Sequence, residues 1–541
     1  MRGEGRRGLA DVTEALLLME EDLDLLEQTV AGVHFWERIR FPVQVAVLQK
    51  AGLVGQSHTV LEHNLSDYLK GALLLAKNLV VRNPYRASRS DVFFLGSPRR
   101  KLRDDGLWWD IYCDPIIEAL DWSYAYFEAP YLNRHMVPQK TQGIRYLDAP
   151  LYWATARQTL GIASVALSQA EKLLLKSIEE GIQSGCGVAI DVEQMVGIDL
   201  LRRKTTLPAY LKLLERVRPR ISLLVDSSGN ETFIEACKTL GIPAVELQHG
   251  VMSRYTLSHS YVGEGRVKRT FPDYLFVFGD YWKETIDYPI PKERIWSIGF
   301  PYLESELRTC SNANRKRQLL FISEGTTGGE MSRFAVELAA SRDLPWKIVY
   351  KLHPGEYARW RTEYPWLATA PLEVVDDDTI PLYRLFAESQ AQVGVCSTAV
   401  FEGLAFGLRT LLLDLPGIEH VEYLLENGFA ALVREPAEIA ERLRDRDSAN
   451  RAVDYLFQPH ALANVDRALR HILVDSRKEI APRDAPQRRT RAQDGWKSPF
   501  TALLRHLSSA RRGLPDLVSL KTGASAAFGD STRATHEHRR S

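Results

Sequence analysis

Residues 221–250 read ISLLVDSSGNETFIEACKTLGIPAVELQHG, and this stretch decides the fold. The run at 221–225 is short and rich in Ile, Leu and Val, which is typical of a buried strand. Apolar side chains at helical spacing follow at 230–240, and Gly241-Ile242-Pro243 ends that helix before a second strand at 244–247. Strand, helix and strand in this order predict a βαβ unit with parallel strands.

A longer series of the same kind follows the polar stretch that ends at Arg317. Its runs are apolar on both faces, as expected when helices cover both sides of a parallel sheet. The expected strands are 319–322, 347–352, 372–375, 391–395 and 410–414, with one earlier strand at 91–95. We therefore predict an α/β protein with two doubly wound, Rossmann-like domains. A helix at 460–474 either closes the second domain or crosses back to the first.

The expected division of the chain has four parts. They are a helical N-terminal extension at 1–90, the first Rossmann-like domain at 91–302, the second at 303–475, and a basic tail at 476–541. From Arg477 onward there are 14 Lys and Arg against 6 Asp and Glu. A composition of Arg, Ser, Pro and Ala favours a largely disordered tail, with one short basic helix that suits an anionic membrane surface.

Charge and cysteine content exclude several classes of protein. The chain of 541 residues contains 69 Lys and Arg and 69 Asp and Glu. This balance gives no long-range attraction for nucleic acid, so we expect no such partner. The five cysteines form no C-x-x-C pair, which predicts neither a disulfide framework nor a zinc ribbon. We expect no signal peptide and no membrane span, and hence a cytoplasmic protein that could meet the inner face of the membrane only peripherally.

Three strand-to-helix junctions of the second domain carry small, hydroxylated or basic side chains. In open parallel sheets ligands bind beyond the carboxyl ends of strands, because loop amides and helix N-termini offer unpaired donors to anions. Taken singly, the junctions also fit a flexible turn, a capped loop histidine and a plain N-cap, but three in one domain favour a nucleotide site. The candidate donor-binding residues are Ser323, Gly325, Thr326, Lys351, His353, Ser397, Thr398 and Glu402. Glu402, about one turn into its helix, is placed to bind ribose hydroxyls.

The first domain offers two candidate catalytic residues at the ends of its βαβ strands. His249 could act as a general base, because the unperturbed pKa of histidine lies near neutrality. The alternative is a histidine bonded locally to the backbone of a tight turn. Asp226 is a second acid or base, unless it only caps the following helix. No group of metal ligands stands out, and the carboxylate run Asp376-Asp377-Asp378 fits a solvated loop and helix cap.

The order of these motifs resembles bacterial glycosyltransferases of the two-Rossmann GT-B type that build capsules and surface polysaccharides. The likeness covers roughly 91–474. It rests on Gly241-Ile242-Pro243 leading into Gln248-His249-Gly250, on Ile298-Gly299-Phe300-Pro301, on Lys351-Leu352-His353-Pro354, and on Ser397-Thr398 through Glu402-Gly403. The His-Pro and Ser/Thr pairs look like those of sialyltransferases and Kdo transferases. The His-Gly pair is similar to that of CDP-glycerol glycerophosphotransferases.

The resemblance implies roles for these residues. His353, Ser397 and Thr398 would contact donor phosphate, and His249 or Asp226 would be the base. It also implies a reaction without metal or other cofactor, in which protein groups stabilise the leaving phosphate. The expected activity is transfer of a sugar or sugar-like group from a nucleotide-sugar donor to a surface or capsular glycan, free or lipid-linked, with inversion. The alternatives are a nucleotide-sugar 2-epimerase of the same fold and a catalytically degenerate GT-B binding subunit.

Overall fold

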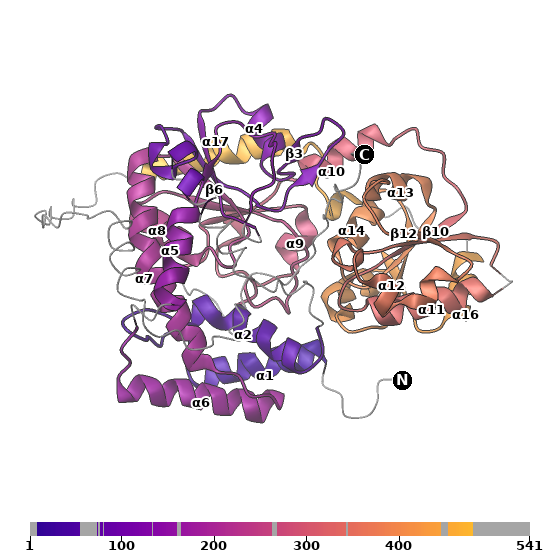
Figure 1. Ribbon diagram of the computed structural model, residues 1–541, viewed down its shortest axis with the longest axis horizontal. Coiled ribbons are helices and arrows are strands. Elements are labelled where there is room, and N and C mark those ends of the chain that lie inside the picture. The colour runs from indigo at the N-terminus through magenta and orange to yellow at the C-terminus, as the bar shows by residue number, and fades with distance from the viewer. Residues whose placement is uncertain are drawn as a thin grey trace, which may run out of the picture.

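The computed structural model describes residues 8–54, 73, 76–78, 80–131, 134–159, 164–261, 268–341, 344–444 and 453–479. Within them the chain forms two lobes, each built on a parallel sheet (Figure 1). The predicted α/β architecture with two doubly wound domains is therefore confirmed. The expected basic helix of the C-terminal tail lies outside the described residues. No helix in the described part of the chain is both long enough and apolar enough to cross a bilayer.

The first sheet has seven parallel strands in the order β5-β4-β1-β6-β7-β8-β9. These are β1 (Val92–Leu95), β4 (Tyr124–Glu128), β5 (Arg145–Tyr146), β6 (Ile221–Val225), β7 (Ala244–Leu247), β8 (Tyr274–Val277) and β9 (Ile295–Ser297). Its helices are α4 (Asp114–Ala119), α5 (Asp148–Thr159), α6 (Gln169–Cys186), α7 (Val192–Val217), α8 (Glu231–Thr239) and α9 (Asp280–Glu284). The predicted βαβ unit is β6-α8-β7, and Gly241, at φ +67°, follows the helix in the left-handed conformation that glycine favours.

The second sheet has six parallel strands in the order β12-β11-β10-β13-β14-β15. These are β10 (Gln318–Ile322), β11 (Lys347–Lys351), β12 (Glu373–Val375), β13 (Ala391–Gly394), β14 (Arg409–Leu413) and β15 (Ala430–Val433). Its helices are α11 (Gly328–Ala340), α12 (Trp360–Glu363), α13 (Leu382–Glu388), α14 (Thr398–Ala405), α15 (Glu422–Glu426) and α16 (Pro436–Arg444). Strands β11, β10 and β13 are neighbours, so the three predicted junctions lie side by side at one edge.

The N-terminal helices are packed onto the first lobe. Helices α1 (Leu9–Asp22) and α2 (Trp36–Lys50) lie beside α6 and α7 in Figure 1. The fully buried Arg38 of α2 places its Nε 2.5 Å from Asp199 Oδ2 of α7 and its Nη1 3.6 Å from Glu235 Oε2 of α8. The described part of the expected extension is thus held to the first domain by buried ion pairs as well as by apolar packing.

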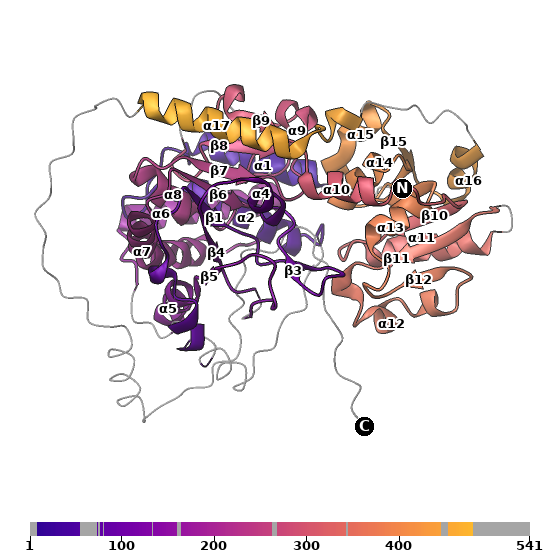
Figure 2. The ribbon, with the colours of Figure 1, turned by 90° about the horizontal axis from the view of Figure 1, so that it is seen from above.

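The last helix, α17 (Ala461–Glu479), crosses back to the first lobe. Figure 2 shows it running along that lobe rather than the second one. Its buried residues Val465, Leu469 and Ile472 pack in one apolar cluster with residues of β1, β6 and β7. We expected the domain 303–475 to include this segment, but its apolar stripe belongs to the first core. The short helix α10 (Pro301–Thr309) connects β9 of the first sheet to β10 of the second.

A small hairpin of the first lobe reaches toward the second. Strands β2 (Lys101–Leu102) and β3 (Trp108–Trp109) pair in antiparallel fashion. Lys101 Nζ lies 5.3 Å from the ring centroids of both Tyr302 on α10 and Tyr383 on α13. The sequence did not predict this hairpin, because strands of two residues are too short to show an alternation of apolar and polar side chains.

A buried ionic network holds the carboxyl end of β4. His135 Nδ1 lies 2.8 Å from Glu128 Oε1, and His135 Nε2 lies 2.8 Å from Asp148 Oδ1. Arg100 Nε lies 2.6 Å from the other oxygen of Glu128. Burial lowers the pKa of His135, but its two carboxylate partners outweigh this and hold the pKa above its usual value. The imidazolium is therefore the form that fits the folded chain.

Replacing His135 with Ala should destabilise the first lobe by about 3 to 5 kcal/mol, because two buried carboxylates lose a cation they share. Urea unfolding followed by tryptophan fluorescence measures the difference. A raised folded-state pKa gives stability that is fully present below the unfolded value of about 6.5 and is lost as pH rises through the folded pKa. The difference in the free energy of unfolding between the native chain and the variant should therefore become smaller in alkaline buffer. A difference that stays constant from pH 6 to 9 would contradict a charged His135.

Candidate active site

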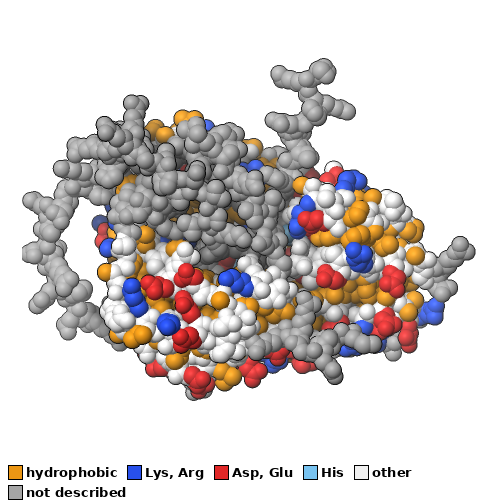
Figure 3. Space-filling model, turned by 60° about the horizontal axis from the view of Figure 1, so that its bottom comes forward, with side chains coloured by type: hydrophobic (Ala, Val, Ile, Leu, Met, Phe, Trp, Pro, Cys, Tyr) orange, Lys and Arg blue, Asp and Glu red, His pale blue; other side chains and the backbone are white. Residues whose placement is uncertain are grey.

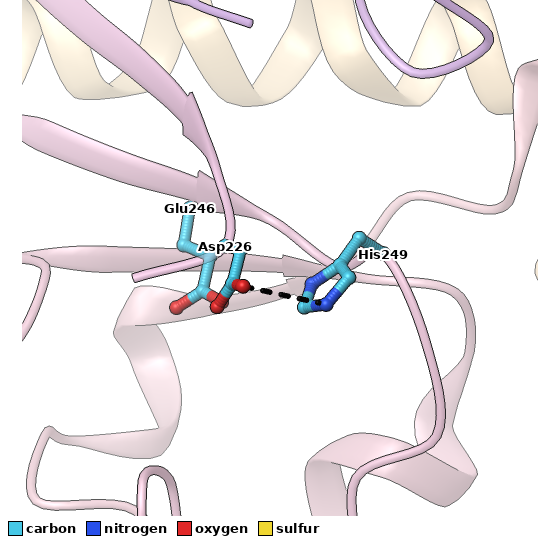
Figure 4. A group of neighbouring side chains, drawn as sticks. All are labelled: Asp226, Glu246 and His249. Carbon is cyan, nitrogen blue, oxygen red and sulfur yellow. Dashed lines mark ion pairs between the residues drawn. The ribbon is translucent and has the colours of Figure 1, made fainter. Parts of the chain in front are cut away.

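Asp226 and His249 lie together at the carboxyl ends of β6 and β7. Figure 4 shows the imidazole of His249 facing the carboxylate of Asp226, with Nε2 3.7 Å from Oδ2. Both side chains are partly open to solvent, at 23% for His249 and 31% for Asp226. Asp226 has a φ of +69°, and its Oδ1 accepts a hydrogen bond of 2.9 Å from the Ser228 amide. The turn thus fixes the carboxylate next to an imidazole that a substrate can reach.

Glu246, which the sequence analysis did not single out, stands behind this pair. It is the third residue of β7 and is almost fully buried. Its Oε1 accepts from the Ser227 amide at 3.2 Å and lies 3.0 Å from His259 Nε2. Burial alone would raise the pKa of Glu246, but His259 reverses this and brings it below its usual value. Burial lowers the pKa of His259, and Glu246 in turn raises it above its usual value.

The three side chains Asp226, Glu246 and His249 each bring one possible metal-binding atom within 4.8 Å of the other two. Carboxylate oxygens and imidazole nitrogens bind divalent cations such as zinc. Glu246 Oε1 already belongs to the contacts with Ser227 and His259, whereas Oε2 has no hydrogen-bond partner within the described ranges. A cation would have to be held by that oxygen together with Asp226 and His249. The expectation of a metal-free site stays a prediction.

In the second lobe, Glu324 joins two of the predicted junctions, and it too was missed. It follows β10, and its Oε1 accepts hydrogen bonds from the amides of Cys396 and Ser397, at 2.7 and 2.8 Å. These amides lead into α14, whose N-cap is Ser397. The Ser397 hydroxyl does not cap the helix, and its buried Oγ has no hydrogen-bond partner among the residues described. Gly325 and Thr326 continue the same loop and are partly exposed.

The junction after β11 is held by its own local contacts. The His353 amide donates to Glu356 Oε2 at 2.7 Å, and His353 Nδ1 accepts from the Gly355 amide at 3.1 Å. Ser323, beside it, is buried and donates to the other oxygen of Glu356 at 3.1 Å. The imidazole of His353 is thereby oriented by its own turn, whereas the Ser323 hydroxyl serves the packing of the loop.

Lys351 and Glu402 are both buried near this edge. Lys351 Nζ donates to the Asp377 carbonyl at 2.7 Å, and burial lowers the pKa of Lys351 to about 8 despite the carboxylates of 376–378. The acidic run 376–378 lies in a loop with Asp377 and Asp378 exposed, as expected, and it also partners this lysine. Glu402 is 8% exposed, and burial raises the pKa of its carboxyl although Lys101 and Tyr383 oppose the shift.

The catalytic candidates of one lobe meet the anion-binding end of the other. A Cβ atom built on Gly250 would lie 3.5 Å from Thr398 Oγ1, so the residue after His249 lies beside the first residue of α14. Ser253 Oγ lies 2.8 Å from His420 Nδ1 across the same boundary, where burial lowers the pKa of His420 to about 4. Tyr112 also donates to the His249 carbonyl at 2.7 Å, fixing the loop. The structure therefore brings the candidate base and the candidate phosphate-binding residues together.

No protein-family model matches the sequence, and no curated protein matches it. Among solved structures, UDP-N-acetylglucosamine 2-epimerase from Rickettsia bellii aligns at 10% identity over 72% of this chain and 99% of its own, with a TM-score of 0.44. The wall teichoic acid polymerase TagF aligns at 12% identity over 77% and 98%, with a TM-score of 0.34. The calicheamicin glycosyltransferase CalG4 aligns at 12% identity over 74% and 100%, with a TM-score of 0.36. The fold assignment rests on the sheet topology rather than on these likenesses.

Replacing His353 or Ser397 with Ala should weaken nucleotide binding by about 1.5 to 3 kcal/mol each, because each change removes a donor to an anion. The probe is whichever of UDP, GDP, CDP and CMP stabilises the native chain most in a thermal-shift screen. Calorimetric titration with that nucleotide gives the affinities. Ser311→Ala, an exposed serine of the same lobe, is the matched control. If both site variants bound the nucleotide as tightly as the native chain, the phosphate would not bind at this edge of the sheet.

Proposed function

We propose that the protein is a glycosyltransferase that moves a sugar or sugar-like group from a nucleotide-activated donor to a surface or capsular glycan. The closeness of Gly250 to Thr398 carries this proposal, because it brings the His249–Asp226 pair near the N-terminus of α14. The dipole at a helix N-terminus favours a phosphate; because Glu324 already takes the amides of Cys396 and Ser397, the hydroxyls of Ser397 and Thr398 would bind it. The donor would bind on the second lobe, and the acceptor would enter from the first.

We assign each group a role in such a transfer. His249 takes the proton from the acceptor hydroxyl as the oxygen attacks the anomeric carbon, and the bond from that carbon to the donor phosphate breaks. The imidazolium that forms lies 3.7 Å from Asp226, whose negative charge stabilises it. Ser397, Thr398 and His353 stabilise the negative charge on the departing phosphate. A base acting directly on the acceptor suits a single displacement, and therefore inversion.

A nucleotide-sugar 2-epimerase is the second candidate, and the crowding of acid and base groups favours it. Asp226, Glu246 and His249 converge within 4.8 Å, so acid and base groups are available to exchange a proton with a bound sugar. Such a reaction needs no acceptor. Incubation with radiolabelled donor distinguishes the two activities, because transfer moves label into glycan whereas epimerisation leaves it in the nucleotide sugar. A binding subunit without turnover would give neither product.

The balance of surface charge supports a partner other than nucleic acid. On the face shown in Figure 3, acidic and basic side chains are interspersed over the described surface of both lobes. This agrees with the equal numbers of basic and acidic residues in the whole chain. A polyanion would find no extended positive surface on this face.

His249→Ala should lower turnover by roughly 10² to 10⁴ with little change in nucleotide affinity, as expected for loss of a general base. Transfer of label from the donor, followed under single-turnover conditions, measures the effect. His471→Ala, on α17, is the matched control and should remain active. An active His249→Ala together with an inactive Asp226→Asn would move the role of base to Asp226.

Removal of divalent cations should leave the transfer rate unchanged. Hydrogen bonds from groups at α14 and from His353 would stabilise the charge on the phosphate, as a metal ion does in other enzymes. The test compares turnover in EDTA with turnover after adding Mg²⁺, Mn²⁺ or Zn²⁺ to chelator-treated protein. A rate that collapses in EDTA and returns with one cation would instead place a metal ion in the active site, where Asp226, Glu246 and His249 offer ligands.

A further inference from the structure

Glu324 occupies the same end of α14 to which the donor phosphate is assigned. Two of the hydrogen bonds that it accepts come from backbone amides that lead into this helix, at 2.7 Å from Cys396 and 2.8 Å from Ser397. Its second oxygen lies 3.4 Å from Cys396 Sγ. The residue is 9% exposed, so the carboxylate sits at the floor of the junction rather than in solvent. The chain therefore carries an anion of its own at its anion-binding helix end.

A phosphate that reaches this helix end must lie next to the carboxylate. The amides of Cys396 and Ser397 are already taken, whereas the buried Ser397 Oγ has no partner within the described part of the chain. Thr398, the first helical residue, faces Gly250 of the other lobe. The hydroxyls of Ser397 and Thr398 are thus the groups left for the phosphate, and the like charge of Glu324 acts on any anion that they bind.

We propose that Glu324 controls the affinity of the donor site for anions: an ionised Glu324 repels the incoming phosphate, and binding is completed by uptake of one proton from solvent onto its carboxyl group. A neutral Glu324 still accepts the amide hydrogen bonds through its carbonyl oxygen, so α14 keeps its position. Its hydroxyl can in addition donate to a phosphate oxygen. This inference rests on the proposed phosphate site, and it holds whichever group is transferred.

The surroundings of Glu324 favour the neutral form. Burial raises the pKa of this carboxyl, although the hydrogen bonds from Cys396 and Ser397 oppose the shift. Two titratable neighbours are neutral: burial holds the pKa of the Cys396 thiol and of the Tyr350 hydroxyl on β11 well above their usual values. Glu419 adds negative charge near Cys396. A bound anion raises the pKa of Glu324 further, so anion binding must strengthen as pH falls.

The test measures sulfate binding to the full-length chain, because the charge of sulfate is constant between pH 5.5 and 8. Glu324→Gln keeps the shape and the amide acceptor but cannot ionise. We expect it to bind sulfate at least about ten-fold more tightly than the native chain at pH 8, with the difference shrinking toward pH 5.5. Glu330→Gln removes one exposed negative charge from the same stretch of chain and should behave as native.

Proton uptake gives a second and independent measurement. Calorimetric titration in buffers of different ionisation enthalpy should show that the native chain takes up more protons on binding sulfate than Glu324→Gln does. Comparing the two chains cancels any contribution of His353, which both retain. Equal uptake, or a Glu324→Gln chain that binds sulfate no better at pH 8, would overturn the proposal. Because no sugar is transferred, these outcomes are separate from the failure of the glycosyltransferase assignment, which the label-transfer assay reports.

Discussion

The close packing of residues 455–461 on the first lobe fixes how the two sheets face each other. A Cβ atom on Gly279 would lie 2.5 Å from the Leu456 backbone, and one on Gly299 would lie 2.1 Å from the Gln458 carbonyl. Such distances are impossible for a real side chain, so the returning chain fits only because both positions lack one. Trp282 Nε1 donates to the Leu456 carbonyl at 3.1 Å and closes the contact. Helix α17 then anchors the second lobe to the core of the first, and the alignment of the site follows from this.

Most buried charges around the candidate site already have a compensating group, whereas the two candidate catalytic residues are partly exposed. Glu246 pairs with His259, and Lys351 is held by the backbone and carboxylates of 376–378. Glu402, the residue expected to bind ribose hydroxyls, lies near Lys101 of the opposite lobe. The two side chains therefore also attract each other across the boundary between the lobes. Asp226 and His249 differ from these groups, because they are partly open and 3.7 Å apart. A proton can reach or leave them without breaking a buried ion pair.

The sequence predicted the strands whose residues are apolar on both faces, and the junctions that follow them. It did not predict Glu246 or Glu324, because a carboxylate within or beside a buried strand is meaningful only once its partner is known. Glu324 binds amides more than seventy residues away along the chain, a separation at which local patterns carry no information. The destination of α17 was left open for the same reason: its apolar stripe shows that a face is buried, but not against which sheet. Long-range pairing therefore limited the prediction of the site more than that of the fold.

The division of the charges between the lobes explains why their contact matters for the proposed reaction. When the acceptor loses its proton, positive charge forms on His249 of the first lobe while negative charge grows on a phosphate at α14 of the second. The two charges arise on opposite sides of the boundary where Gly250 lies beside Thr398. Opposite charges near a protein surface attract each other more strongly than they do in bulk water. Each lobe alone would have to form its charge without this compensation. The return of α17 to the first lobe thus serves the proposed reaction as well as the fold.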